Sequence, residues 1–183
     1  MDTGRLQIRK FTQNDLAAIY EYLSDPEVVK YEPYPPLSQE QCGKYLSQMA
    51  DSKDFWAVCL RGSGKLAGQV YLSEKEQNTW EVGYVFNRKY QNQGMASEAV
   101  HALISYIFER RNAHRVVANC NPDNTPSWRL LERLGFRKEG YLKENVYFNT
   151  DEQDNPIWQD TFEYGVLCSE WDLKIGERLN NED

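Results

Sequence analysis

The chain of 183 residues is 40% hydrophobic and carries a formal net charge of −7. Without a Lys/Arg stripe, this charge excludes a nucleic-acid backbone as the main partner, and no apolar run reaches the roughly 18 residues that a membrane helix requires. A cytoplasmic protein with a cationic or amine-bearing partner is the remaining expectation.

The length is sufficient for one sizeable hydrophobic core, and no Pro/Gly/Ser-rich linker divides the chain. A single domain over residues 1–183 is therefore expected, with its core at about 5–171 and a polar tail at 172–183.

Hydrophobic periodicity divides the chain into short strands and helices. In chain order it predicts a strand over 6–11, helices over 12–23 and 39–50, strands over 55–61, 66–72 and 80–86, a helix over 95–111, a strand over 114–120, a short helix between 124 and 135, and strands over 136–148 and 161–168. Residues 25–37 are expected to be irregular, and residues 149–159 to form a loop. The fold class is mixed α/β (α+β), with helices flanking a sheet that contains a central antiparallel meander.

Polar residues mark where several of these helices begin and end. A side-chain oxygen at Thr12 can satisfy a free N–H at the start of the first helix, and Ser38 with Gln41 has the spacing of a capping box. Pro126 suits the first turn of the short helix, and Gly135 suits the left-handed position that ends it.

The sequence GSGK at residues 62–65 has two interpretations. Glycines supply the positive φ angles of a turn between the two flanking strands. A phosphate-binding P-loop would instead need Gly at position 59 and Ser or Thr at position 66, where the chain has Cys59 and Leu66. The turn is favoured.

The four cysteines give no sign of a metal or disulfide site. Cys42, Cys59, Cys120 and Cys168 are scattered, without CxxC spacing or a nearby histidine. We expect reduced thiols, no metal, and no nucleophilic cysteine paired with histidine.

The sequence YQNQGMAS at residues 90–97 lies directly before the longest predicted helix. A glycine there lets the backbone approach a ligand, and the N–H groups at a helix N-terminus attract anions. The helix dipole adds roughly 0.3–1 kcal/mol to such binding. A phosphate group is the natural ligand, although a plain strand-to-helix turn explains these residues equally well.

The segments around this loop occur in a recognisable order. The strand WEVGYVF (80–86), the loop QNQGMA (91–96), the long helix and NPDNTPSWRLLERLGFRKEG (121–140) together resemble the GNAT superfamily of acyl-CoA-dependent N-acetyltransferases. The phosphate-binding loop of that superfamily has the form Q/R-x-x-G-x-G/A.

Other segments resemble one branch of the superfamily, the ribosomal-protein-alanine (Rim-type) N-acetyltransferases. These segments are VKYEPYPPLSQEQ (29–41), the N-x-x-S motif at Asn124 and Ser127, and DTFEYGVLCSEW (160–171). The resemblance covers about residues 5–171, and the ordered set is more specific than any single motif.

The resemblance implies acetyl-CoA as co-substrate and a sheet in which two central strands splay into a wedge. Backbone N–H groups around Gly94 would hold the pyrophosphate, and pantetheine would lie along the strand of Val85 and Phe86. The implied cofactor-binding residues are Val85, Phe86, Gln91, Asn92, Gln93, Gly94, Met95, Ala96, Ser97 and Asn124.

Direct attack of a neutral amine on the thioester needs a proton acceptor and a donor for the departing thiolate. Glu81 is similar in placement to a family glutamate that deprotonates the acceptor through water; a paired strand-end carboxylate is its structural alternative. Ser127 matches a serine that Rim-type enzymes place near the sulfur, or is a helix-capping residue. Where many family members have a proton-donating tyrosine, this chain has Leu131.

The resemblance places Glu32, Tyr34 and Glu144 on the acceptor side of the wedge as substrate-binding residues. An α-amino group is roughly a tenth neutral at pH 7, whereas a lysine is neutral in under about one part in a thousand. A weak base therefore favours the N-terminal α-amine of a protein or peptide. A small amine such as a polyamine, amino sugar or antibiotic is an alternative, as is an acyl-CoA-binding module without turnover. Monomer and homodimer are both open.

Overall fold

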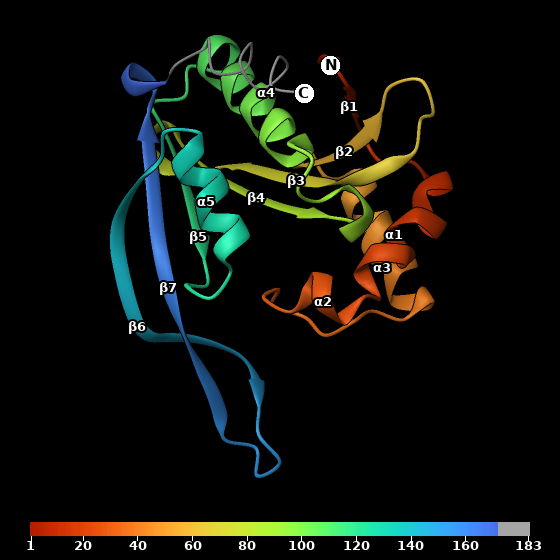
Figure 1. Ribbon diagram of the computed structural model, residues 1–183, viewed down its shortest axis with the longest axis vertical. Coiled ribbons are helices and arrows are strands. Elements are labelled where there is room, and N and C mark those ends of the chain that lie inside the picture. The colour runs from red at the N-terminus through yellow and green to blue at the C-terminus, as the bar shows by residue number, and fades with distance from the viewer. Residues whose placement is uncertain (172–183) are drawn as a thin grey trace.

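A seven-stranded sheet runs through the protein, whose computed structural model describes residues 1–171 (Figure 1). The predicted tail at 172–183 lies outside the described residues. In chain order the elements are β1 (Leu6–Arg9), α1 (Leu16–Leu23), α2 (Pro26–Val29), α3 (Gln39–Asp51), β2 (Phe55–Leu60), β3 (Leu66–Glu74), β4 (Thr79–Phe86), α4 (Met95–Arg110), β5 (Arg115–Cys120), α5 (Thr125–Arg133), β6 (Arg137–Thr150) and β7 (Pro156–Leu167). The sheet order is β1-β2-β3-β4-β5-β7-β6. Only β4 and β5 pair in parallel, so the predicted mixed, mostly antiparallel sheet is confirmed.

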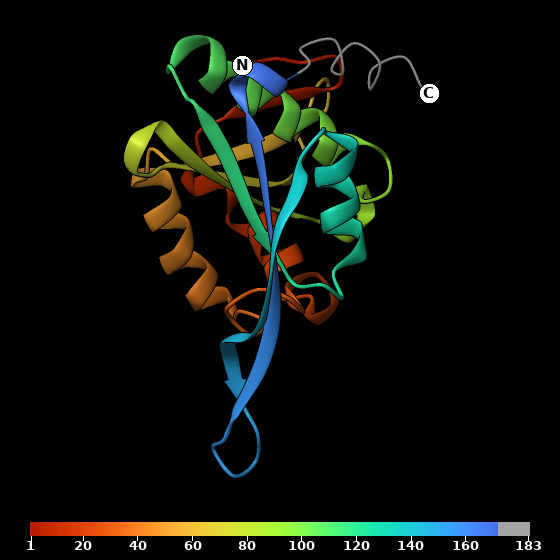
Figure 2. The ribbon, with the colours of Figure 1, turned by 90° about the vertical axis from the view of Figure 1, so that its left-hand side faces the viewer.

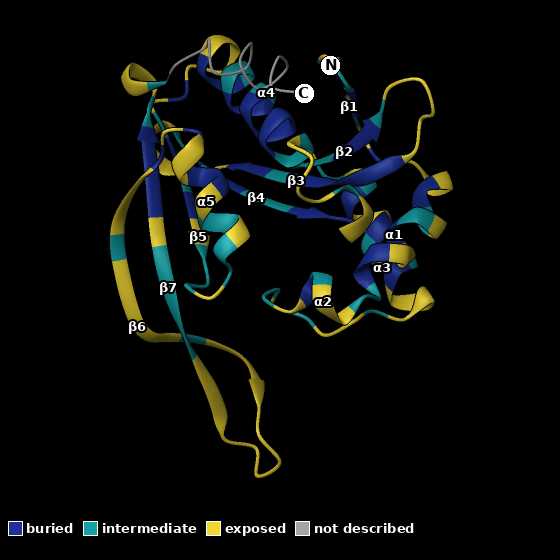
Figure 3. Ribbon diagram, in the orientation of Figure 1, coloured by how far each residue is buried: buried dark blue, intermediate teal, exposed yellow. Residues whose placement is uncertain are grey.

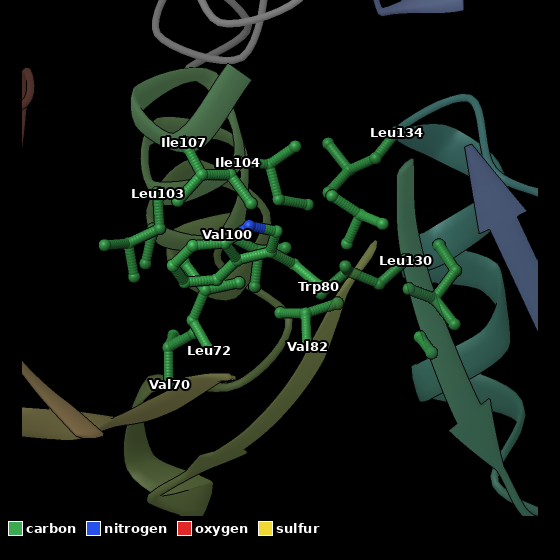
Figure 4. Packing of buried hydrophobic residues seen from close by; sticks show 14 of the residues in the cluster. Val70, Leu72, Trp80, Val82, Val100, Leu103, Ile104, Ile107, Leu130 and Leu134 are labelled. Carbon is green, nitrogen blue, oxygen red and sulfur yellow. The ribbon is translucent and has the colours of Figure 1, made fainter. Parts of the chain in front are cut away.

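Successive side chains of a strand point to opposite faces, so the sheet supplies two cores. The larger core lies against α4 and α5 (Figure 4), and it includes Val70, Leu72, Trp80, Val82, Val100, Leu103, Ile104, Ile107 and Leu130. The second core lies against α1, α2 and α3, and it includes Ile19, Tyr22, Val29, Leu46, Met49, Ala57, Cys59 and Val85. Figure 2 shows α3 and α5 on opposite sides of the sheet.

The pairing of β4 with β5 stops halfway along both strands. It runs from Thr79 opposite Arg115 to Glu81 opposite Val117, although β4 continues to Phe86 and β5 to Cys120. Over the same length β4 stays paired with β3, and β5 stays paired with β7. The two central strands therefore diverge, which confirms the predicted wedge.

Helix starts largely follow the local sequence signals. Ser38 Oγ accepts from the Gln41 N–H at 3.3 Å, and Gln41 Oε1 accepts from the Ser38 N–H at 2.8 Å, so the capping box is confirmed. Before α1 the roles differ from the prediction: the Asp15 carboxylate accepts from the Thr12 N–H at 2.8 Å. Residues 13–15 form a 3-10 turn, and α1 is shorter than the predicted helix.

The GSGK segment is a turn, as favoured by its sequence. Gly62 and Gly64 have φ angles of +85° and +67°, and the Gly64 N–H donates to the Leu60 carbonyl at 2.9 Å.

The predicted irregular connection at 25–37 contains one short helix, α2. Asp25 accepts from the Glu27 N–H at 3.0 Å, and Pro26 occupies the first turn. Both features are start signals of a helix, and the prolines that follow masked them in the sequence.

The prediction of a loop over 149–159 was wrong. β6 continues to Thr150 and β7 begins at Pro156, so only 151–155 form a turn. Asp151 closes this turn by accepting from two backbone N–H groups. Paired in this way, the two strands project beyond the rest of the sheet as an exposed hairpin (Figures 1 and 3).

Candidate active site

Two cavities border the wedge between β4 and β5. The first, of about 440 Å³, is called the aromatic cavity, and its lining includes Glu32, Tyr34, Tyr45, Phe55, Gln69, Tyr71, Glu81, Cys120, Leu131 and Phe148. The second, of about 530 Å³, is called the loop cavity, and its lining includes Lys30, Phe86, Gln91, Asn92, Gly94, Met95, Ala96, Ser97 and Arg133. Both are lined by Tyr31, Glu32, Tyr84, Val85, Asn124 and Ser127. The cavities therefore meet at the second half of β4 and the start of α5.

Gly94 places the N-terminus of α4 against the loop cavity. It is the N-cap residue of this helix, with a left-handed φ of +74°. The N–H groups of the next three residues have no acceptor inside the helix, because an intrahelical bond needs a carbonyl four residues earlier. Met95, Ala96 and Ser97 all line the cavity, which gives it the donors and the dipole end that bind phosphate.

Side-chain hydrogen bonds brace this loop from behind. Gln91 Nε2 donates to the Phe86 carbonyl at 2.9 Å, and Gln93 Nε2 donates to the Lys89 carbonyl at 2.8 Å. Arg5 Nη1 donates to the Gln93 carbonyl at 3.0 Å. Gln93 is not among the lining residues of the loop cavity, and its hydrogen bonds give it a bracing role; its contact with a cofactor stays a prediction.

Two cations face the same cavity as the loop. Arg133 reaches it from the last turn of α5 and donates to Ser97 Oγ at 3.0 Å, while Lys30 approaches from the end of α2. Sequence reasoning missed both residues, because nothing in the local sequence indicates that α5 and α2 meet the loop. Their charge adds to the attraction that the helix N-terminus exerts on an anion.

Ser127 contacts a tyrosine where the two cavities meet. The Tyr84 O–H donates to the Ser127 carbonyl at 2.9 Å, and the two hydroxyl oxygens are 3.1 Å apart. Burial raises the pKa of Tyr84, so its hydroxyl is protonated at neutral pH. The N-cap residue of α5 is Asn124 and not Ser127, which removes the capping role considered for Ser127.

Asn124 keeps its side chain available at the same place. It lines both cavities and makes no side-chain capping bond, and its backbone carbonyl accepts from the Ser127 N–H at 3.0 Å. Val85 and Phe86 lie opposite, on the part of β4 that β5 does not pair with. Leu131 occupies the sequence position at which the resemblance would lead one to expect a proton-donating tyrosine. Its apolar side chain lines the aromatic cavity.

Four aromatic rings in succession form one wall of the aromatic cavity. The ring centroids of Tyr34 and Tyr45 are 5.9 Å apart, those of Tyr45 and Phe55 5.9 Å, and those of Phe55 and Tyr71 5.1 Å. Buried Gln69 holds the Tyr45 ring of this wall in place. It accepts from the Tyr22 hydroxyl at 2.8 Å and donates to the Tyr45 hydroxyl at 3.4 Å. Of these rings, only Tyr34 was predicted.

Two carboxylates border this cavity. Glu81 forms an ion pair with Lys75 at 2.9 Å and lies at the closed end of the wedge. Glu32 lines both cavities, and burial raises its pKa from 4.5 to about 7, a shift that the nearby Tyr34 hydroxyl partly opposes.

Glu144, predicted on the acceptor side, lines neither cavity. It lies on the exposed face of β6, where a register shift gives it a φ of +45° and its N–H donates to Asp160. Phe148, four residues further along the strand, lines the aromatic cavity instead. The backbone of β6 is irregular between Leu142 and Val146, and the sequence does not indicate this irregularity.

Nucleophilic-cysteine chemistry finds no support at the wedge. Burial raises the pKa of Cys120 to about 11, so the thiol is neutral at physiological pH. Neither His101 nor His114 is among the residues that line the two cavities.

Within residues 1–171 there is also no cluster of three or more metal-ligating side chains, and no helix long and apolar enough to cross a membrane.

Comparison with known proteins agrees with the fold. The family model of the acetyltransferase (GNAT) domain matches residues 5–137. The uncharacterized N-acetyltransferase YnaD of Bacillus subtilis (strain 168) is 37% identical over 92% of this chain and 97% of its own. The [ribosomal protein uS5]-alanine N-acetyltransferase of Escherichia coli (strain K12) is 38% identical over 49% of this chain and 43% of its own. A GNAT-family acetyltransferase structure from Bacillus anthracis superimposes with a TM-score of 0.85, at 36% identity, over 93% of this chain and 99% of the other.

A sheet split beside a glycine-containing helix N-terminus defines an acyltransferase scaffold. This chain belongs to the GNAT family, and it is an N-acetyltransferase that moves an acetyl group to an amine. The family draws that acetyl group from acetyl-CoA.

The loop geometry yields a first prediction, for Gly94→Glu. The new side chain places a negative charge beside the N–H groups of residues 95–97, so if these groups bind the phosphates, affinity for CoA should fall at least about 100-fold while the fold survives. Isothermal calorimetry measures the affinity, and circular dichroism checks the fold. Gly62→Glu is the matched control, because Gly62 also has a positive φ and stands in open space far along the chain from the loop. CoA binding retained by folded Gly94→Glu would exclude the loop as the phosphate site.

The Tyr84 and Ser127 hydroxyls yield a second prediction. If they supply the proton to the departing thiolate, Ser127→Ala and Tyr84→Phe should each lower kcat, by roughly 100-fold for the serine, and leave the KM for acetyl-CoA nearly unchanged. Steady-state kinetics that follow the free thiol measure both constants. Tyr164→Phe is the matched control, since it removes a hydroxyl that bonds Glu132 at 3.0 Å outside both cavities. Equal kcat in all three variants would remove the proton-donor role.

Proposed function

We propose that this enzyme acetylates the N-terminal α-amine of a peptide or protein by direct attack on the thioester of acetyl-CoA. The observation that carries the proposal is the meeting of the two cavities at the unpaired half of β4. The loop cavity has the donors and cations suited to a phosphate-bearing cofactor, the aromatic cavity has the ring wall and Glu81, and Glu32 lines both. Both open onto Tyr84, Val85 and Ser127.

The residues of the loop cavity fit acetyl-CoA, which supplies an acetyl group already activated as a thioester. The N–H groups of residues 95–97 would bind its pyrophosphate, with Arg133 and Lys30 adding positive charge. The backbone edge of Val85 and Phe86 would hydrogen-bond the pantetheine as a strand partner would, and Asn124 would hold it from the opposite side.

The reaction itself needs two proton transfers and no covalent enzyme intermediate. The amine nitrogen forms a bond to the acetyl carbon, the carbon–sulfur bond breaks, and the sulfur leaves as a thiolate. The amine proton passes to a base, and the thiolate takes a proton from a donor. We assign the donor to the Ser127 hydroxyl, which Tyr84 can reprotonate across 3.1 Å.

For the base, the geometry favours Glu32 over Glu81, which the sequence suggested first. Glu32 lies where the two cavities meet, and its pKa of about 7 matches a group that takes a proton near neutral pH. Glu81 is held by Lys75 at the closed end of the wedge. In that position it suits attraction of a cationic amine better than proton transfer.

An α-amine suits this base. With a pKa of roughly 7.7–8.0, it has a substantial neutral fraction near pH 7, so a carboxylate of similar basicity can complete the deprotonation. A lysine side chain would have to give up about two and a half further pKa units of proton affinity. Small amines such as a polyamine, amino sugar or antibiotic are the second candidate class, since Glu32 and Glu81 would attract any cation to the aromatic wall.

Competition between acceptors tests the proposal. Peptides with a free N-terminus and no lysine should be acetylated at least about 10-fold faster than the same peptides with a blocked N-terminus and one lysine. Mass mapping of the modified position measures the outcome, with polyamines, amino sugars and aminoglycosides assayed in parallel. Acetylation of lysine alone, or of small amines alone, would contradict an α-amine acceptor.

The raised pKa of Glu32 gives the pH dependence its sign. Below about pH 7 this carboxyl holds a proton and cannot accept another, so kcat/KM of the wild type should rise through this region before the acceptor amine itself deprotonates. Glu32→Gln should lose this first rise, retain the second, and turn over roughly 100-fold more slowly at high pH. A pH series with one peptide measures both inflections.

Glu81→Gln is the paired variant for this experiment. It should raise the KM for the peptide and keep the inflection near 7. The opposite pattern, in which Glu81→Gln loses the inflection and Glu32→Gln retains it, would return the role of base to Glu81. An unfolding series adds a second readout: because the folded state holds the Glu32 proton more tightly, stability should fall as pH rises from about 4.5 to 7, and less so in Glu32→Gln.

A further inference from the structure

The outer part of the β6–β7 hairpin, residues 141–162, exposes more apolar surface than any other described segment. We call it the arm. Six of the eight exposed large hydrophobic residues among residues 1–171 lie on it, and Figure 3 shows the arm as almost continuously exposed. These six are Tyr141, Leu142, Tyr147, Phe148, Ile157 and Trp158. Exposed apolar surface on a projecting two-stranded hairpin indicates that the hairpin binds a partner.

One face of the arm is continuous with the aromatic cavity. Tyr147 pairs with Trp158, and their rings are 5.2 Å apart on the same face. The next residue on β6, Phe148, projects from the other face because side chains alternate along a strand, and it lines the aromatic cavity. A chain leaving that cavity past Phe148 therefore meets the arm directly.

The arm also presents an open backbone edge. β6 is the last strand in the sheet order, so within residues 1–171 no strand lies beside it on the side that faces away from β7. Such an edge binds an extended polypeptide by adding it as a further strand. Register shifts interrupt the β6 edge after Leu142 and after Tyr147, which limits its pairing with a long, regular strand.

The charge of the arm is strongly negative. Glu144, Asp151, Glu152, Asp154 and Asp160 stand against Lys143 alone, a net charge of −4. Lys143 neutralises Asp160 at 2.8 Å, and Asp151 is used by the turn, whereas Glu152 and Asp154 are exposed at the tip. An arm-to-arm contact with a second copy would bring these carboxylates together, so charge favours a basic partner.

The size of the apolar surface indicates how firmly the partner is held. A large apolar or aromatic side chain that is half exposed leaves roughly 100 Å² in contact with water, so the six residues offer about 600 Å², divided between the two faces of the arm. A stable protein complex buries roughly 800 Å² on each partner. The arm therefore suits a transient partner, such as a substrate that must leave after each turnover.

We propose that the arm is a docking surface for the acceptor polypeptide, which lies along it in an extended, basic segment downstream of the N-terminal amine. This inference rests on the proposed function. The first residues of the acceptor enter the aromatic cavity, the chain leaves it past Phe148, and its Lys/Arg side chains then meet Glu152 and Asp154. The arm thereby selects among proteins whose N-terminal residues are the same.

Three peptides with identical first residues test this docking: a short one, a long one with basic residues downstream, and a long one with acidic residues downstream. The wild type should show a KM at least about 10-fold lower for the long basic peptide than for the short one, and no gain for the long acidic peptide. Glu152→Lys combined with Asp154→Lys should abolish the gain and leave kcat and KM for the short peptide within about twofold. Asp51→Lys, at an exposed carboxylate outside the arm and both cavities, is the control.

A binding assay separates this proposal from the proposed function. Fluorescence anisotropy of the long basic peptide with its N-terminus already acetylated should show binding that Ile157→Ser weakens and the paired lysine substitutions abolish, whether or not any peptide is turned over. Ile157 is exposed and lies on the same face of the arm as Phe148, because it follows Pro156 and precedes Trp158, the partner of Tyr147 on the other face. Binding of this kind without turnover of any peptide would sustain the docking surface and contradict the α-amine acceptor. Acetylation of all three peptides with equal KM would overturn the docking surface and leave the function intact. A dimer in sedimentation that Trp158→Ser dissociates would overturn it too, by assigning the arm to a second copy.

Discussion

The separation of β4 from β5 after three residue pairs is the constraint on which the rest of the structure depends. A parallel pair that continued to Phe86 and Cys120 would satisfy the facing backbone groups of both strands and close the sheet. By parting, the strands leave the edge of Val85 and Phe86 open toward the cavities, at the cost of lost ladder hydrogen bonds. The outer edges of the two strands stay hydrogen-bonded, because β3 remains paired with β4, and β7 with β5, along the diverging halves.

The same separation places different groups on the two sides of the wedge. The N-terminus of α4, Arg133 and Lys30 face the loop cavity, Glu81 borders the aromatic cavity, and Glu32 lines both. In the proposed function, the helix N-terminus and the two cations attract the phosphates of the cofactor, and the two carboxylates attract a cationic amine. Burial at that point raises the pKa of Glu32 to about 7, so the carboxyl that meets both cavities changes its charge within the physiological range.

Local signals predicted those parts of the molecule that depend on neighbouring residues in the sequence. The capping box at Ser38, the glycine turn at 62–65 and the left-handed Gly135 all follow from backbone requirements within a few residues. Contacts between residues that are far apart in the sequence could not be predicted from such local signals. Tyr84 meets Ser127 from 43 positions away. The exposed aromatic pair of Tyr147 and Trp158 extends two strands through residues whose polar neighbours favoured a loop. In each case tertiary contacts decided an outcome that propensity alone left open.

Glu144 lies in an irregular stretch of β6. Between Leu142 and Val146, β6 advances by four residues where β7 advances by two, and Glu144 within this stretch has a φ of +45°. Glu144 is exposed there, whereas Phe148, beyond the irregular stretch, lines the aromatic cavity. An apolar ring in place of a carboxylate leaves the amine-attracting charge to Glu32 and Glu81, deep in the wedge, and makes the exit apolar. Exposed carboxylates follow along the hairpin, at Glu144 and at the tip at Glu152 and Asp154. An acceptor chain bound as proposed would need its cationic amine at one end, apolar side chains behind it, and cations further along.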